Sequence, residues 1–553
     1  MLIRIAKLRS FVKILIDGLL LLGVFTTVRG NNIQINTVSV EDRDTATGMA
    51  YIRFTLSWDH SWKDRLHQNW DAAWVFAKCY SAETRQWRHV YLSPAKGRPV
   101  ATGGGSYMAA PHSIGSANEP MWSEFATSQT DFGEKTTGFF IYRKEVGNGS
   151  NFIEDIRLQF NYREHDYLDD DLFQVAVYAI EMVYVPKNQF IIGDGSSDNA
   201  LYMDGSNLII KTSIPSNQSS WMGKVTGEKG ITYLGTAVPD TFPKGYNAVY
   251  MMKYEITQHG YADFLNTLTP EQQTSRTSTS PYAAKGTLAF NAAPYTSNFL
   301  QYRNYIRVRI PAEAETDEYP AKGAVYGHSI SGGAAAEQWE MENNGGNIAC
   351  NFLDWNDGLA YLDWACLRPM TEMEFEKACR GHQFLRKSMA WGYQTGISAN
   401  ARGIKNAGLP NEEAVDPAAC YLEIGKAPWV MRVGAFAKDS TSRDQAGATY
   451  FGIMNMSDNL WERCINVSTP EGRSFIPKDG DGVLDDGGFA QVDDFNTGVI
   501  CWPEEKGGGF RGFQISNRKY AASVQVNANE GRRNPWSGFR GCRFPPAETK
   551  FDL

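Results

Sequence analysis

The chain has 553 residues, and its 54 Lys and Arg against 62 Asp and Glu give a formal net charge of −8. Binding to a phosphate backbone requires a strongly basic surface, so this charge argues against nucleic acid as a partner. Aromatic residues make up 13% of the chain and charged residues only 21%, which excludes a coiled coil or a disordered chain. The length allows about two to four globular domains.

The first thirty residues have the order of an export signal. Basic residues between positions 4 and 13 precede an apolar run from Leu19 to Phe25, and Gly30 offers a small residue at a cleavage site. We therefore expect a signal peptide over residues 1–30 and a mature protein that is secreted or periplasmic, in the cell envelope. Asp17 interrupts the apolar stretch, and an uncleaved membrane anchor is the alternative. No other stretch approaches the roughly 18 apolar residues of a spanning helix.

Alternation of apolar and polar residues dominates from residue 31 to residue 180. Residues 33–40 and 51–58 alternate as half-buried strands do. Further short strand-like segments, separated by Gly, Ser, Asn and Asp, lie at residues 73–77, 138–142, 156–160 and 173–178. This pattern predicts an all-β, immunoglobulin-like sandwich over residues 31–180. The Gly-rich stretch at residues 101–131 is predicted to be a long loop or an insertion.

From residue 181 to residue 553 the pattern changes to mixed α and β structure with long loops. Helices are predicted at residues 257–268, 355–364 and 371–380. The third begins with a capping box, in which Thr371 is followed three residues later by Glu374, and Gly381 supplies a stop signal. The fold class predicted for the whole chain is therefore α+β, preceded by the all-β sandwich.

Ordered motifs in this second region resemble the formylglycine-generating enzyme family, also called sulfatase-modifying factor domains. The matching segments are an entry strand at 181–194, a helix at 254–266, WNDGLAY at 355–361, LRPMTEMEFEKACRG at 367–381, NMSDNLWE at 455–462 and GFR at 538–540. The resemblance implies a variant C-type-lectin-like fold that is compact but poor in regular structure. An N-terminal β-sandwich joined to such a domain also resembles envelope proteins of the Bacteroidota.

The resemblance also implies a chemistry, because the family enzyme is a copper-dependent oxidase that converts a substrate cysteine to formylglycine. Two thiols hold its Cu(I), and soft thiolates are the ligands that Cu(I) selects. The family places them after a Gly-Gly-Ser turn. This turn can be aligned with the chain in two registers. One places the two thiol positions at Gly512 and Asn517, and the other places them at Asn517 and Ala522. No cysteine occurs between Cys501 and Cys542, so no catalytic residue is assigned and copper is not expected.

A structural calcium site is the second property that the resemblance implies. Carried over position by position, its ligands are the Asn455 side chain, the carbonyls of Asp458 and Leu460, and the Glu462 carboxylate, all hard oxygen donors suited to calcium. Asp458 stands where the family usually has Gly, and a hydrogen-bonded turn without metal is the alternative. The acidic run at residues 479–486 lacks a full set of calcium-loop ligands and is predicted to be a solvated turn.

Eight cysteines are present, none in the Cys-x-x-Cys spacing of zinc ribbons or thioredoxin-type sites. The resemblance implies a disulfide between Cys379 and Cys542, which in the chain-entropy view would contribute about 4 kcal/mol or more. The cysteines without an assignable partner are Cys79, Cys350, Cys366, Cys420, Cys464 and Cys501.

Three functions are compatible with these observations. The first is a pseudoenzyme, a non-catalytic binding or scaffolding module of the cell envelope with a protein or peptide ligand, or a glycan. The second is a formylglycine-generating-type oxidoreductase that acts on protein cysteines through an atypical metal site containing Cys464 or Cys501. The third is a carbohydrate-binding protein, because 15 Trp residues provide aromatic faces on which sugars stack.

Overall fold

The structure is a computed structural model. It describes residues 32–93, 100–101, 107–109, 112–114, 117–131, 133–172, 174–193, 201–210, 223–291, 301–317, 319–330, 345–382, 389–392, 396–422, 427–438, 441–467, 470–491, 510–513 and 533–546. The predicted export signal, Cys501, Asn517 and Ala522 lie outside these ranges. Among the described residues no helix is long and apolar enough to cross a membrane.

The first part of the chain is built from β-strands, as the alternating pattern predicts. Its strands are β1 (Gln34–Asp44), β2 (Met49–Asp64), β3 (Asn69–Ser81), β4 (Gln86–His89), β5 (Val100–Ala101), β6 (Tyr107–Ala109), β7 (His112–Ile114), β8 (Met121–Thr130), β9 (Gly133–Arg143), β10 (Gly147–Asn161) and β11 (Gln174–Val185). In β2 the buried side chains alternate with half-exposed ones, because successive residues point to opposite faces of a sheet.

Strand β8 corrects one expectation from the sequence. It occupies residues 121–130, inside the segment predicted to be a loop, and pairs with β9 in an antiparallel register from Met121 opposite Arg143 to Thr130 opposite Gly133. The upstream glycines suggested a loop for the whole segment, whereas the end of the segment has buried apolar residues on both faces of the strand, Met121 on one and Ala126 on the other.

Strand β11 joins the two parts that the sequence suggested. Residues Gln174 to Val183 pair with β3, and residues Met182 to Val185 pair with β18 (Val249–Met252). The boundary predicted between residues 180 and 181 therefore lies inside a single strand. One 14-stranded sheet runs from the N-terminal strands through β11 and β18 to β27 (Gly541–Arg543) and β21 (Arg368–Pro369).

The second part consists of short strands, short helices and connecting loops. Its helices are α2 (Gln258–Leu265), α3 (Pro270–Arg276), α4 (Trp355–Trp364), α5 (Glu372–Arg380) and α6 (Pro470–Arg473). Its remaining strands are β12 (Phe190–Ile192), β13 (Leu201–Asp204), β14 (Asn207–Ile210), β15 (Gly223–Val225), β16 (Thr232–Tyr233), β17 (Thr236–Ala237), β19 (Ile306–Ile310), β20 (Val325–His328), β22 (Ile404–Lys405), β23 (Glu413–Ala414), β24 (Trp461–Ile465), β25 (Phe510–Phe513) and β26 (Ser537–Gly538). The chain is thus mostly β with few helices.

The predicted helix signals are confirmed. The Glu374 amide donates to Thr371 Oγ1 at 3.2 Å, and the Thr371 amide donates to Glu374 Oε2 at 3.0 Å, which forms the predicted capping box. Gly381 ends α5 with a φ of 59°, in the region that favours glycine. The helix predicted over residues 257–268 is shorter than expected, because α2 ends at Leu265 and a new cap at Thr269 starts α3.

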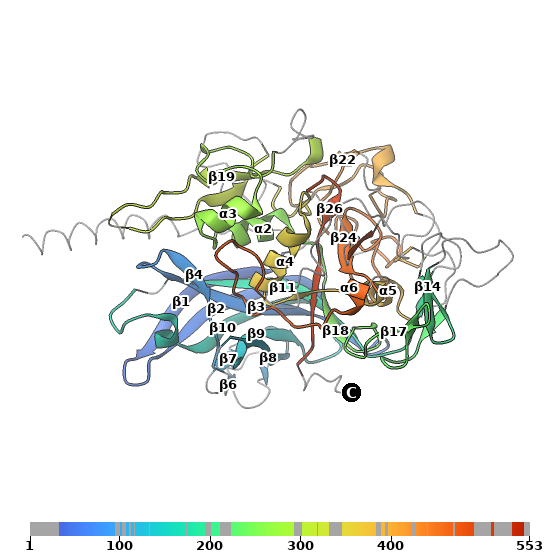
Figure 1. Ribbon diagram of the computed structural model, residues 1–553, viewed down its shortest axis with the longest axis horizontal. Coiled ribbons are helices and arrows are strands. Elements are labelled where there is room, and N and C mark those ends of the chain that lie inside the picture. The colour runs from blue at the N-terminus through green and yellow to red at the C-terminus, as the bar shows by residue number, and fades with distance from the viewer. Residues whose placement is uncertain are drawn as a thin grey trace, which may run out of the picture.

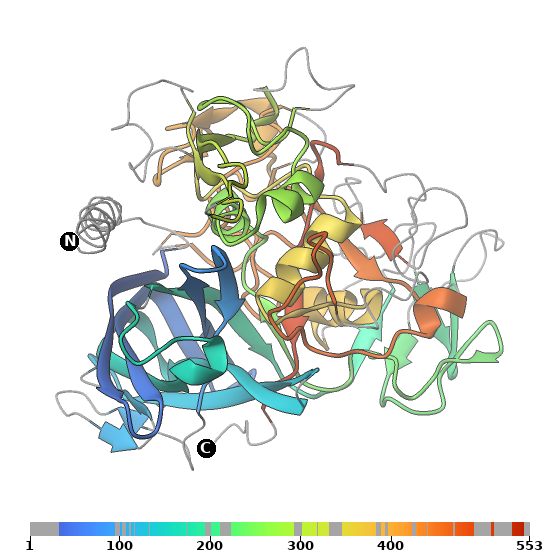
Figure 2. The same cartoon turned by 60° about the vertical axis from the view of Figure 1, so that its left-hand side comes forward.

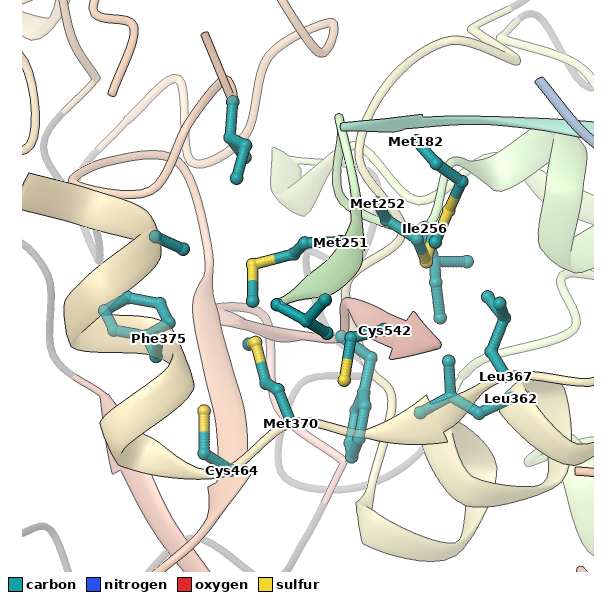
Figure 3. Close-up of a cluster of buried hydrophobic side chains, with 14 of the residues drawn as sticks. Met182, Met251, Met252, Ile256, Leu362, Leu367, Met370, Phe375, Cys464 and Cys542 are labelled. Carbon is teal, nitrogen blue, oxygen red and sulfur yellow. The ribbon is translucent and has the colours of Figure 1, made fainter. Parts of the chain in front are cut away.

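The two parts share one apolar core. Trp70 of β3 donates its indole N–H to the Tyr250 hydroxyl of β18 at 3.0 Å, and Trp74 donates to the Ala365 carbonyl after α4 at 2.8 Å. Figures 1 and 2 show the blue N-terminal strands packed against the yellow helices and the red C-terminal segments. Figure 3 shows the methionine-rich part of this core, where β18, α5 and β27 meet.

Candidate functional site

The strand pair β24–β25 corresponds to the region where the resemblance places the copper thiols. The two strands are antiparallel, with Arg463 opposite Gly512 and Cys464 opposite Arg511. Strand β26 runs parallel to β24 on its other side, with Trp461 opposite Ser537. Gly512, a thiol position in one register, therefore lies in a regular strand and offers no sulfur.

Cys464 is the cysteine that this strand pair contributes, and its thiol faces the core. The residue is fully buried, and Figure 3 shows it beside Met370 and Phe375. Burial, followed by the nearby Glu462 carboxylate, raises the pKa of the Cys464 thiol well above its usual value. Because the thiolate is the form that binds metal and reacts, this thiol is poorly suited to either role.

Cys379 and Cys542, the pair predicted to form a disulfide, are both free thiols in the structure, so the bridge is not formed there. Cys379 lies in α5, and Cys542 lies in β27 opposite Met251 and Arg368. Burial raises the pKa of both thiols well above the usual value. Every described cysteine is free and buried, namely Cys79, Cys350, Cys366, Cys379, Cys420, Cys464 and Cys542.

The turn predicted to bind calcium is held together by its own side chains. Asn455 adopts a left-handed conformation with a φ of 60°. Its Oδ1 accepts a hydrogen bond from the Gly434 amide at 2.8 Å, and its Nδ2 donates to the Asp458 carboxylate at 3.1 and 3.2 Å. Asp458 Oδ2 also accepts from the Leu422 amide at 3.1 Å. Asp458, which replaces the family's usual glycine, therefore fastens the turn to the segment at Leu422, and Asn455 fastens it to the segment at Gly434.

Glu462 is paired with an arginine from another motif. Arg540, the arginine of the GFR motif, donates to Glu462 Oε1 through Nε at 2.8 Å, and its terminal nitrogen lies 2.7 Å from the same oxygen. The same guanidinium donates to the carbonyls of Met252, Lys253 and Met454. Both side chains of the pair are fully buried. Two motifs that lie far apart in the sequence thus form one buried ion pair.

Glu255 belongs to the same cluster, although no sequence signal assigned it there. Its carboxylate accepts from Asn459 Nδ2 at 2.6 Å and from the Leu460 amide at 3.0 Å. Burial, followed by repulsion from Glu462, raises its pKa well above the usual range. Burial also raises the pKa of Asp458 to about 7. The cluster therefore contains three buried carboxyl groups around the single guanidinium of Arg540.

The donor chemistry of this cluster fits a hard cation. Glu462 Oε2 is buried and has no hydrogen-bond partner in the described structure, and the carboxyl groups outnumber the guanidinium. These features favour an oxygen-ligated ion such as calcium. Glu462 Oε1 is already occupied by Arg540, however, and the described residues contain no group of three or more His, Cys, Asp or Glu side chains that could hold a metal. Backbone carbonyls and the Asn455 amide would have to supply the remaining ligands.

The acidic run at residues 479–486 is only partly solvated. The Asp479 side chain is 8% exposed, lies 3.9 Å from Arg368 Nε and from Arg543 Nε, and accepts from the Phe544 amide at 3.2 Å. The expectation of a solvated turn is therefore wrong at Asp479, because two buried arginines require a counter-charge that local sequence does not reveal.

Comparison with known proteins gives one family match. The model of the family described as "Sulfatase-modifying factor enzyme 1-like domain" matches residues 215–544, more than half of the chain. The matched range contains β24, β25 and the carboxyl cluster. A search of curated proteins found no match.

Proposed function

The chain belongs to the family of sulfatase-modifying factor enzyme 1-like domains, and from this premise we propose that it is a non-catalytic binding or scaffolding module. We propose further that it is exported and acts in the cell envelope, with a protein or peptide as its ligand. The observation that carries the proposal is the absence of sulfur at Gly512 in β25, together with the burial of Cys464 in β24.

The chemistry explains why this observation matters. Cu(I) requires soft donors, and a thiol must lose its proton to serve as one. A buried thiol with a raised pKa stays protonated at neutral pH, and reaching solvent would require β24 to separate from the core. The oxidoreductase alternative therefore needs a rearrangement of β24 or a contribution from Cys501.

Copper loading of the purified protein tests the proposal. Wild type and Cys464→Ser are incubated anaerobically with Cu(I), bound copper is measured, and oxidation of a cysteine-containing sulfatase-type peptide by oxygen is followed by mass spectrometry. We expect no stoichiometric copper and no oxidised peptide in either protein. Copper-dependent oxidation in wild type would overturn the proposal. Its loss in Cys464→Ser would then assign the ligand to β24, and its retention would point to Cys501.

The binding half of the proposal has a separate test. The same peptide, labelled with a fluorophore, is titrated with wild-type protein in the absence of copper, and anisotropy is recorded. Saturable binding without oxidation supports a module that keeps a peptide-binding surface of its family. Absence of binding together with absence of turnover would remove sulfatase-type peptides as the ligand class.

A carbohydrate ligand is the second candidate, and one aromatic pair favours it. The rings of Tyr302 and Trp429 meet edge to face with centroids 4.8 Å apart, and both residues are partly exposed. Trp429 has a φ of 72°, a strained conformation for a large side chain, and such strain concentrates at binding sites. Glycan-array binding that is lost in Trp429→Ala but kept in Tyr282→Ala, an exposed aromatic control, would support this candidate.

We also propose a structural calcium ion at the 455–462 turn, held by Asn455 Oδ1, the carbonyls of Asp458 and Leu460, and Glu462. The excess of buried carboxyl groups and the unpartnered Glu462 Oε2 support it. Calcium added after chelation should raise the melting temperature of wild type, and Asn455→Ala should abolish that rise. A wild-type melting temperature that does not respond to calcium would count against the ion.

A further inference from the structure

Two histidines from separate elements meet at the surface of the second part. His259 lies in the first turn of α2, and His328 ends β20. His259 Nδ1 lies 3.3 Å from His328 Nε2, and the ring planes are inclined by 77°. The His259 side chain is 62% exposed and His328 is partly exposed. His259 lies inside the 254–266 helix segment of the family resemblance, whereas His328 lies outside its matching segments.

The backbone around the pair fixes both rings. The His259 amide donates to the Gly346 carbonyl at 2.8 Å, and Asn266, which caps the C-terminal end of α2, accepts from the Tyr326 amide of β20 at 2.6 Å, so the helix and the strand are fastened together. A Cβ atom at Gly346 would lie 2.6 Å from the His328 ring. The ring therefore occupies space that only a glycine at position 346 leaves open.

A carboxylate supports the outer side of His259. Asp263, one turn further along α2, places Oδ2 3.5 Å from His259 Nε2. A carboxylate at this nitrogen favours the tautomer that carries its proton on Nε2, which leaves the Nδ1 lone pair directed toward His328. Metal-binding histidines are commonly oriented by such a carboxylate on their other ring nitrogen.

We propose that His259 and His328 form a binding site for a divalent transition metal ion such as Zn²⁺. Zinc–nitrogen bonds are about 2.0–2.1 Å long, and two of them at a tetrahedral angle separate their nitrogens by about 3.3 Å. The observed separation of 3.3 Å matches this spacing. Imidazole is a ligand that suits zinc, copper and nickel. Among the residues that the structure describes, the ligands that we assign to this ion are the two imidazoles.

This proposal is independent of the proposed function and of the calcium turn. A hydrogen bond between two neutral imidazoles produces the same nitrogen separation, so metal titration decides between the two. The full chain is titrated with Zn²⁺ alone by calorimetry, and Co²⁺ is used in parallel because its visible absorption reports the coordination geometry. Single variants His259→Gln and His328→Gln remove one ligand each. His382→Gln is the matched control, since His382 is exposed and bonds the Tyr450 hydroxyl at 3.1 Å.

We expect one saturable zinc ion in wild type and in His382→Gln, with affinity reduced at least tenfold in His259→Gln and in His328→Gln. Asp263→Asn should weaken binding by about 10-fold or more through the lost carboxylate support. Excess calcium should leave zinc binding unchanged, because calcium prefers oxygen ligands. Zinc binding that is absent in wild type, or unchanged in both ligand variants, would overturn the proposal and leave the pair as a hydrogen bond.

Discussion

A buried lysine joins the N-terminal strands to the family domain, and its replacement gives the sharpest test of the fold. Lys253 Nζ lies 2.7 Å from Glu181 Oε2 and 3.4 Å from Asp71 Oδ2, and the three side chains are at most 2% exposed. Asp71 also accepts from Trp58 Nε1 at 3.1 Å and from Ser61 Oγ at 2.6 Å. Burial lowers the pKa of Lys253, but the Glu181 carboxylate, Tyr254 and Asp71 together outweigh burial, and the pKa is raised overall.

Lys253→Met should destabilise the protein by about 3–5 kcal/mol, because removing one partner leaves an uncompensated buried charge. Two carboxyl groups would then share an apolar site, and burial already raises the pKa of Glu181. Replacing Glu181 by Gln in the same chain should recover much of the loss, since Asp71 keeps its hydrogen-bond donors. Lys405→Met is the matched control: its Nζ lies 2.8 Å from Glu413, but the lysine side chain is 52% exposed. An exposed pair of this kind contributes about 0–1 kcal/mol.

Urea unfolding followed by tryptophan fluorescence and far-ultraviolet circular dichroism measures these differences. Coincident transitions would show that the N-terminal strands and the family domain unfold together. A loss below about 1 kcal/mol in Lys253→Met, equal to that in Lys405→Met, would refute the reasoning that the buried cluster fastens the two parts.

Three further predictions concern the carboxyl cluster, the GFR motif and the cysteines. Burial raises the pKa of Asp458 from 3.8 to about 7, so the stability that its protonated form contributes is full below pH 3.8 and is lost as the pH rises through 7. The melting temperature of wild type should therefore fall over this pH range through Asp458, and the melting temperature of Asp458→Asn should lack this part of the fall. Gly358→Ala should cost about 1–3 kcal/mol in urea unfolding, because its Cβ would lie 2.2 Å from the Phe539 ring, whereas Gly227→Ala, with open space around it, should be near neutral. Alkylation without reductant should label Cys379 and Cys542 only after denaturation; resistance of both in the denatured chain would demonstrate the disulfide instead.

Local patterns were sufficient to predict the elements whose signals lie within a few residues. Alternation located strands such as β2, and the spacing of Thr371 and Glu374 located the start of α5. The same reasoning placed a domain boundary inside β11, because periodicity describes each segment separately and cannot show that one strand pairs with both β3 and β18. Pairing partners that lie between 64 and 112 residues apart leave no local trace.

The carboxyl cluster shows the same limit at the level of single residues. The resemblance identified Asn455 and Glu462, and both lie in the cluster. It did not identify Glu255 as their neighbour, because the contact between Glu255 and the Leu460 amide spans 205 residues. Nor did it show that Arg540 neutralises Glu462, although each residue belongs to a recognised motif. Motifs identify which residues matter, whereas the charge balance among them depends on the folded chain.

The N-terminal strands pack against the family domain through buried hydrogen bonds and a shared apolar core. Beyond the Lys253 cluster, Lys78 of β3 donates to the Gly482 carbonyl at 2.8 Å, and Asn69 donates to the Phe451 carbonyl at 2.7 Å. Leaving such buried donors and acceptors unpaired costs about 1–3 kcal/mol each. Separation of the two parts would break these bonds and expose the shared core around Trp70. A ligand that binds preferentially to the native form of either part therefore stabilises the whole molecule.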